Sequence, residues 1–331
     1  MSIIIFVLFV FYTYFDKLGI IIFIKDINGR KIIVELRVLQ YFLAIAREET
    51  ISGAAEALHI TQPTLSTQIK ELEDELGKQL FMRSNKKIVL TQEGRLLRQR
   101  AEELVSLANK TKQEIMLSDE SMMGTIYIGA GESHTLKIVT KAMKKMKICY
   151  PHVQFHIYSG NSDEVIEKLD NGLVDFALLT DHPKIAKYNH LRMPLCPRWG
   201  VLLPRDDDLA KKETITFQDI QDKPLIVTKE LPHLSQLVEW FHNDIDHLNI
   251  VSSYTLLYNA SLMVEDRLGY AVCFDKIINT SGDSLLTFRP LEPLLEVPHY
   301  FIWKKYQILP KISECFLQII QETIKEIENN K

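Results

Sequence analysis

The chain has 331 residues, of which 46% are hydrophobic and 25% are charged. This composition is that of folded globular domains and excludes collagen-like, low-complexity and wholly disordered chains, and the length suffices for two or three domains. With 39 Lys and Arg against 43 Asp and Glu, the formal charge of −4 gives no overall basic field for nucleic acid. Any binding of nucleic acid must therefore be local.

The first 33 residues differ in character from the rest of the chain. An apolar run over residues 3–15 is shorter than the ~20 residues that a membrane-spanning helix needs, and Asp16 and Lys17 interrupt its extension. A secretory signal would need a basic start and a small-residue cleavage site, which this segment lacks. We expect residues 1–33 to be a non-native upstream extension from a misassigned start, with the native chain beginning near Val34. The alternative is a membrane anchor over residues 3–24.

Three helices are predicted from the apolar spacing that follows. Apolar residues recur every three or four positions over residues 36–46, and a second, short helix is expected over residues 52–58. Thr61 offers an N-cap hydroxyl for a third helix, which has proline in its first turn. Gly77 is well placed to end that helix. Two short helices in tandem are typical of a DNA-binding helix-turn-helix.

The third helix has a small polar outer face near its N-terminus. Pro63, Thr67 and Lys70 lie on that face, with Ser66 on its flank and Gln62 at its start. Serine, threonine and glutamine side chains reach base edges in a major groove, while a lysine and the helix N-terminus bind phosphate. The pattern alone also fits a solvated face of any helical bundle.

A basic hairpin is predicted next. Strand-like runs over residues 80–82 and 88–90 flank a polar segment with three cations, Arg83, Lys86 and Lys87. A basic hairpin directly after a helix-turn-helix is placed to contact a minor groove or the phosphate backbone. We therefore expect a winged helix-turn-helix domain over residues 34–92.

These residues carry a family resemblance. The stretch over residues 54–97 resembles the winged helix-turn-helix of LysR-type transcriptional regulators. The matching residues are Ala54-Ala55, Gln62-Pro63, Leu65-Ser66, Ile69, Leu72-Glu73, Leu76-Gly77, Leu80-Phe81, Arg83, Leu90-Thr91 and Gly94.

The resemblance implies roles for particular side chains. Gln62, Pro63 and Ser66 would contact DNA in the major groove, with Arg83 and Lys86 serving the wing. The position after Ser66, usually arginine in this family, is Thr67 here. The resemblance also implies a start near residue 34, since these proteins commonly open with Met-Glu-Leu-Arg or similar.

A long connecting helix is predicted over residues 93–120. Its small and apolar residues follow the four-three rhythm of a two-helix seam. They are Leu97, Ala101, Leu104, Ala108, Thr111 and Ile115. A helix packed on its own domain is the alternative, but the length and the two alanines favour pairing. We expect a dimerisation helix, because dimers match inverted-repeat half-sites in DNA.

The remainder alternates strands and helices. A βαβαβ unit is predicted over residues 125–179, similar units follow to residue 274, and a last strand and helix lie over 298–303 and 312–327. The LysR resemblance continues here and implies a periplasmic-binding-protein-like fold. The predicted fold class is thus α/β, with an N-terminal winged helix-turn-helix, a linker helix and a two-lobed, doubly wound effector-binding domain. Lobe I would comprise residues 124–196 and 293–331, and lobe II residues 197–292.

Strand-to-helix turns nominate an effector site in this domain. In doubly wound folds, ligands bind at the carboxyl ends of strands, where helix N-termini aim free N–H groups. The candidates are Ser133, His134, Thr135, Asn161, Ser162, Thr228 and Asn259. For each residue alone, a helix-capping role is the simpler interpretation. Together, the residues favour binding of a small, anionic effector.

Dinucleotide binding, metal binding and redox sensing have weaker support in the sequence. The turn Gly129-Ala130-Gly131 mimics half of a dinucleotide fingerprint, but the third glycine is missing and no acidic residue stands where the ribose would be bound. No ligand spacing for a metal is present among the histidines and cysteines. The four cysteines are far apart, which favours a reducing, cytoplasmic location. Cys196 and Cys273 are candidate redox sensors, with buried structural thiols the preferred interpretation.

The sequence therefore predicts a cytoplasmic, effector-controlled transcriptional regulator without catalytic residues, metal or cofactor. Its expected partners are promoter DNA with inverted-repeat half-sites, a small-molecule effector and further copies of the chain as a dimer and tetramer, with RNA polymerase as a candidate and no membrane. The alternatives are an NAD(P)-dependent oxidoreductase that uses the Gly129 turn and a membrane-anchored solute-binding protein.

Overall fold

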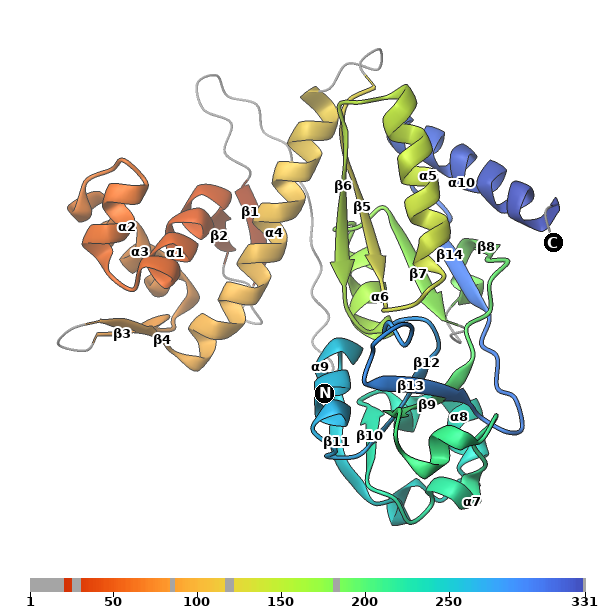
Figure 1. Cartoon of the computed structure of the whole chain (residues 1–331). Coiled ribbons are helices and arrows are strands. Elements are labelled where there is room, and N and C mark those ends of the chain that lie inside the picture. The colour runs from red at the N-terminus through yellow and green to blue at the C-terminus, as the bar shows by residue number, and fades with distance from the viewer. Residues whose placement is uncertain (1–20, 26–30, 84–86, 117–121, 181–184, 330–331) are drawn as a thin grey trace. The chain divides into compact units, whose positions relative to one another are not determined.

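The computed structural model describes residues 21–25, 31–83, 87–116, 122–180 and 185–329. The chain divides into two compact units, residues 1–115 and 116–331. Figure 1 traces the elements of each unit in chain order. Most of the N-terminal extension lies outside the described residues, as does Lys86 in the predicted wing.

The first unit opens with a two-stranded antiparallel hairpin, β1 (Ile21–Lys25) and β2 (Lys31–Glu35). Val34, where the domain boundary was predicted, lies in β2 and is buried in the core of this unit. A membrane-spanning helix through residue 24 is incompatible with β1, because a strand there leaves its backbone groups to be paired by a neighbouring strand rather than within a helix. That alternative is therefore wrong over residues 21–24.

Three helices follow the hairpin: α1 (Leu36–Glu48), α2 (Ile51–Ala57) and α3 (Gln62–Leu76). Their shared core is apolar and fully enclosed, with Leu39, Phe42, Ala54 and Leu65 at 0% exposure. This core comes from the predicted three- and four-residue spacing, which puts one face of each helix inward.

The wing consists of β3 (Phe81–Arg83) and β4 (Ile88–Leu90), paired antiparallel. The Glu73 carboxylate in α3 accepts hydrogen bonds from the backbone N–H groups of Leu80 and Phe81, at 2.7 and 3.2 Å. The phenyl rings of Phe42 and Phe81 lie 5.1 Å apart between centroids. The wing is thus fixed directly to the helices that precede it.

The long helix α4 (Gln92–Met116) begins at a predicted cap. The Thr91 hydroxyl accepts a hydrogen bond from the Gly94 N–H at 2.9 Å and donates one to the Gln79 carbonyl at 2.8 Å. Gly94 must remain glycine for close packing, because a Cβ there would lie 2.1 Å from the Leu80 carbonyl oxygen. The start of α4 is therefore locked onto the chain just before β3.

The second unit contains two five-stranded mixed sheets. The first has the order β6-β5-β7-β14-β8, in which β5 is parallel to β6 and β7, and β14 is antiparallel to β7 and β8. Its strands are β5 (Gly124–Ala130), β6 (Val153–Ser159), β7 (Phe176–Thr180), β8 (Tyr188–Arg192) and β14 (His299–Lys304). Its helices are α5 (Leu136–Cys149), α6 (Ser162–Asp170) and α10 (Lys311–Asn329).

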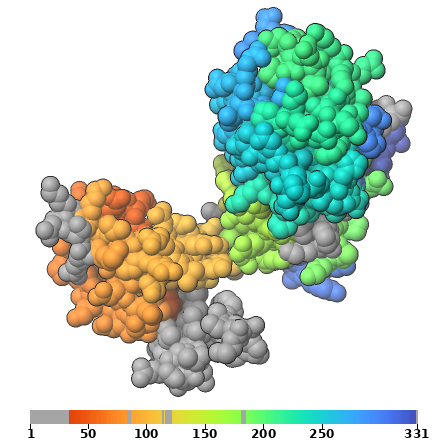
Figure 2. Space-filling model, turned by 90° about the horizontal axis from the view of Figure 1, so that it is seen from below, coloured from red at the N-terminus to blue at the C-terminus, as the bar shows by residue number. Residues whose placement is uncertain are grey.

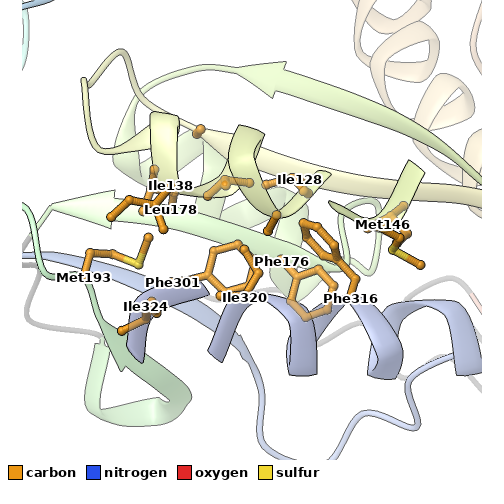
Figure 3. Close-up of a cluster of buried hydrophobic side chains, with 14 of the residues drawn as sticks. Ile128, Ile138, Met146, Phe176, Leu178, Met193, Phe301, Phe316, Ile320 and Ile324 are labelled. Carbon is orange, nitrogen blue, oxygen red and sulfur yellow. The ribbon is translucent and has the colours of Figure 1, made fainter. Parts of the chain in front are cut away.

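The core of this sheet joins distant parts of the chain. Figure 3 shows Phe316, Ile320 and Ile324 of α10 pointing toward the sheet, where Phe176 and Phe301 lie side by side. Phe176 and Phe301 stack with centroids 5.0 Å apart, and both are fully buried. The C-terminal strand and helix therefore complete the sheet begun at residue 124.

The second sheet has the order β11-β10-β12-β9-β13. Its strands are β9 (Trp199–Pro204), β10 (Leu225–Thr228), β11 (Ile250–Tyr254), β12 (Tyr270–Phe274) and β13 (Leu286–Pro290). Its helices are α7 (Phe217–Ile220), α8 (Ser235–Trp240) and α9 (Leu257–Glu265). The described residues of this unit also form four 3-10 turns: η1 (Ile185–Lys187), η2 (Asp208–Lys211), η3 (Leu231–His233) and η4 (Ile245–His247). In Figure 2 the atoms of the two lobes form adjoining masses, coloured yellow-green and green to light blue.

Candidate DNA-binding face and effector cleft

The N-terminal turn of α3 presents its polar side chains to solvent, as predicted. The Thr61 hydroxyl accepts a hydrogen bond from the Thr64 N–H at 3.3 Å and so caps the helix. Gln62, Pro63 and Thr67 are exposed on the surface, while Ser66 is half-buried. Lys70 is exposed one turn further along, and it forms no ion pair with any residue that the structure describes. The predicted face is therefore free to meet a partner.

A tight turn sets the angle between α2 and α3. The backbone N–H of Ile60 donates to the Ala55 carbonyl at 3.0 Å, and His59 has the left-handed φ of 55°. A non-glycine residue rarely adopts this conformation. At the other end of α3, Gly77 has φ 62° and ends the helix as predicted.

The cations of the wing are only partly described. Lys86 and the side chain of Arg83 lie outside the described residues. The Lys87 ammonium pairs with the Glu49 carboxylate, and both side chains are at least half exposed. An exposed pair of this kind contributes ~0–1 kcal/mol, so Lys87 can exchange Glu49 for a phosphate at little cost.

The predicted seam of α4 divides into two parts. Ala101 is fully buried in the core of the first unit, and Leu97 packs against that core. The prediction that Ala101 contacts a second chain is therefore wrong, because its side chain is enclosed inside the winged domain, whereas Leu97 is half-buried and stays a prediction. Further along the helix, Leu104 is 38% and Ile115 79% exposed, and Ala108 is half-buried. This part remains a candidate pairing surface.

A cavity of about 100 Å³ lies between the two sheets of the second unit. Residues from the turns after β5, β6 and β10 line it, as the doubly wound topology predicts. Of the predicted effector residues, the lining includes Ser133, Asn161, Ser162 and Thr228.

The other predicted effector residues lie elsewhere. Asn259 lines a neighbouring depression with Ser253 and Tyr254, and His134 is absent from both linings. Thr135 is fully buried and lines neither of the two hollows, so the structure does not place it beside a ligand. Its N–H donates to the Ser133 hydroxyl at 3.2 Å, which makes it part of the turn's own structure.

The side chains of two glutamates bridge the cleft, one from each lobe. Glu230 of the second lobe accepts a hydrogen bond from the Ser162 N–H, the first residue of α6, at 2.9 Å. Glu132 of the first lobe accepts one from the Leu257 N–H, the first residue of α9. Burial raises the pKa of Glu230, while its hydrogen bond with Ser162 opposes the rise.

This arrangement changes the basis of one prediction. An anionic effector was expected because helix N-termini would offer free N–H groups. At α6 and α9 a carboxylate of this chain already meets such a group. That argument for an anion therefore no longer holds at these two helices.

Sequence reasoning missed several residues of the cleft. Glu132, Glu230, Trp199, Phe274 and His299 all line the cavity. Glu132 stands within the turn that the strand-helix pattern nominated, and an acid beside Ser133 was a usable signal. Glu230 likewise follows the nominated Thr228 by two residues, whereas Trp199, Phe274 and His299 come together only through the folding of distant strands, which no local pattern encodes.

His299 is the most deeply buried polar group of this lining. Its side chain is 2% exposed, and its Nδ1–H donates to the Val297 carbonyl at 3.1 Å. Burial lowers the pKa of His299 to about 4. The imidazole is therefore neutral at pH 7, with Nε2 as a bare acceptor.

The structure gives a different role to Gly129, one of the two glycines that suggested a dinucleotide site. Gly129 lies in β5, and a Cβ there would meet a Val165 methyl group at 2.6 Å. Its small size serves the packing of α6 on the sheet. Burial of Cys273 raises the pKa of its thiol, which disfavours a reactive thiolate. Among the described residues, no group of acidic, histidine and cysteine side chains is arranged to hold a metal ion, and no helix has the length and apolarity to span a membrane.

A winged helix-turn-helix joined to a two-lobed binding unit with a cleft defines a ligand-responsive DNA-binding regulator. Two family profiles match the chain: the bacterial regulatory helix-turn-helix protein, lysR family, over residues 36–95, and the LysR substrate binding domain over residues 119–325. The chain belongs to the LysR family of transcriptional regulators. Proteins of this family bind DNA and small-molecule effectors and form oligomers.

Individual relatives agree with this assignment. The chain is 32% identical to the HTH-type transcriptional regulator BsdA of Bacillus subtilis over 59% of this chain and 67% of the relative. It is 26% identical to the Hca operon transcriptional activator HcaR of Escherichia coli over 89% and 99% of the two chains. The fold is similar to that of full-length CbnR complexed with its target DNA, with a TM-score of 0.67 and 17% identity over 88% and 100% of the chains.

Proposed function

We propose that this protein binds promoter DNA with inverted-repeat half-sites through the N-terminal turn of α3. The exposed polar face of that turn is the observation that carries the proposal. The proposed contacts in the major groove are Thr61, Gln62, Pro63, Ser66 and Thr67, and Lys70 would bind phosphate. Arg83, Lys86 and Lys87 would supply phosphate and minor-groove affinity from the wing.

A small effector bound in the cleft would control this activity. The cavity lies between two lobes that the chain connects at more than one point, so a ligand that contacts both lobes favours one arrangement of them. Ser133, Asn161, Ser162 and Thr228 are the proposed polar contacts. His134 and Asn259 remain proposals from the sequence. The protein would act in the cytoplasm, without catalysis, and RNA polymerase is a candidate partner.

Gel retardation of duplex DNA from upstream of the protein's own gene tests this function. We expect specific retardation that weakens steeply between about 50 and 200 mM salt, because lysine and arginine contacts to phosphate release counterions. An unrelated duplex of equal length is the control. Equal affinity for both duplexes at all salt concentrations would contradict sequence-specific binding.

Pairing through the exposed part of α4 would supply the dimer, and dimers would assemble into a tetramer. Ile115→Glu places a charge on this surface and is expected to raise the dimer dissociation constant about tenfold or more. Leu96→Glu is a matched control, because Leu96 is 62% exposed on the same helix but off the seam. Sedimentation equilibrium measures both variants. Dissociation of the Leu96 variant alone would move the pairing surface to another face.

A further inference from the structure

Among the charged side chains that line the cleft, hydrogen-bond acceptors outnumber donors. Its charged lining residues are Glu132, Lys229 and Glu230, two acids against one base. Each glutamate uses one carboxylate oxygen on a helix N-terminus, Oε2 in Glu132 and Oε1 in Glu230. The second oxygen of each has no hydrogen-bond donor among the described residues. A carboxylate accepts at both oxygens, so two acceptor positions remain for a ligand.

The buried histidine adds a third acceptor from a different strand. His299 of β14 is 2% exposed and lines the cavity. Since Nδ1 donates to the Val297 carbonyl, the neutral ring has no proton on Nε2. Nε2 has no partner among the residues that the structure describes. A ligand that brings N–H groups would donate to this acceptor, whereas a carboxylate would face its lone pair.

Aromatic rings complete the surroundings. Trp199 and Phe274 line the cavity with ring centroids 4.2 Å apart, and Phe274 contacts the His299 imidazole at 5.7 Å. The face of an aromatic ring attracts a cation within about 6 Å. An anion placed here would instead meet two carboxylates, and like charges that share a buried site repel strongly.

We propose that the cleft binds an organic ammonium ligand, with its N–H groups directed at Glu132, Glu230 and His299 and its apolar part beside Trp199 and Phe274. The proposal rests on the proposed function, because it names the chemical class of the effector. An ammonium group supplies three donors, which matches the three acceptors.

Calorimetric titration of the full chain with three probes of one shape tests the proposal. The probes are benzylammonium, benzyl alcohol and benzoate, at pH 7.5 and equal ionic strength. We expect saturable binding of benzylammonium, at least tenfold weaker binding of benzyl alcohol and none of benzoate. Tighter binding of benzoate than of benzylammonium would overturn the proposal, and so would a lack of saturable binding by benzylammonium.

Two variants locate the site. Glu132→Gln and Glu230→Gln keep an oxygen that accepts the helix N–H but remove the charge, and each is expected to raise the dissociation constant of benzylammonium about tenfold. Glu213→Gln, at an exposed position of the second unit, is the control and should leave that constant unchanged. Unchanged binding in both cleft variants would overturn the proposal. If upstream DNA is retarded specifically while benzylammonium does not bind, only the ligand class fails; loss of specific retardation is a failure of the proposed function.

Discussion

Replacing Thr67 with arginine is expected to tighten binding to promoter DNA by about 5- to 150-fold. Thr67 is exposed on the proposed groove-facing side of α3. An arginine there can form a bidentate contact with guanine, worth about 1 to 3 kcal/mol, or bind a phosphate and add about one unit of salt slope. Threonine offers only one hydroxyl and one methyl group, which suit a single hydrogen bond or a thymine methyl. At the base pair that faces Thr67, the protein should accordingly have a weaker base preference, or the native half-site should be richer in A·T.

Titrations on a randomised half-site at two salt concentrations measure this effect. Gln221→Arg, which adds the same charge at an exposed position of the other unit, controls for unspecific attraction. In the same assay Gln62→Ala should flatten base preference, while Lys86→Ala should weaken all sequences about equally. If Thr67→Arg changes neither affinity nor salt slope beyond the Gln221 control, this side of α3 does not enter the groove.

The winged domain was predictable because its signals are local. Thr61 and Gly77 mark the ends of α3 through hydrogen bonds and a backbone angle that involve only near neighbours in sequence. Spacing alone could not assign Ala101, since the four-three rhythm is the same whether a helix packs on its own domain or on a second chain. Its burial in the winged core decides between them.

The second unit shows more clearly which features local sequence patterns cannot predict. The parallel strands before and after α5 and α6 were predicted from alternating apolar strands and amphipathic helices. The strands β8 and β13 were missed, because both are sheet edges paired antiparallel and rich in polar residues. The cross-cleft bond between Glu230 and Ser162 joins residues 68 positions apart. No periodicity reports such a contact.

Stability at acidic pH should reveal the buried histidine of the cleft. The pKa of His299 is about 4 in the folded chain, because burial disfavours the imidazolium, against about 6.5 in the unfolded chain. Between these values the unfolded chain binds more protons, so the free energy of unfolding falls as the pH falls. The contribution is fully present above about pH 6.5 and lost toward pH 4, and the difference of about 2.5 pKa units corresponds to about 3 kcal/mol.

Denaturant unfolding of the full chain at several pH values between 4 and 7 measures how the unfolding free energy depends on pH. A probe of the second unit, such as tryptophan fluorescence, follows the unfolding. His299→Asn keeps an N–H donor for the Val297 carbonyl but does not titrate, so its unfolding free energy should depend less on pH by about 3 kcal/mol over this range. His152→Gln is the matched control, because His152 is exposed. Equal slopes for wild type and His299→Asn would mean that the imidazole gains a proton in the folded cleft without cost.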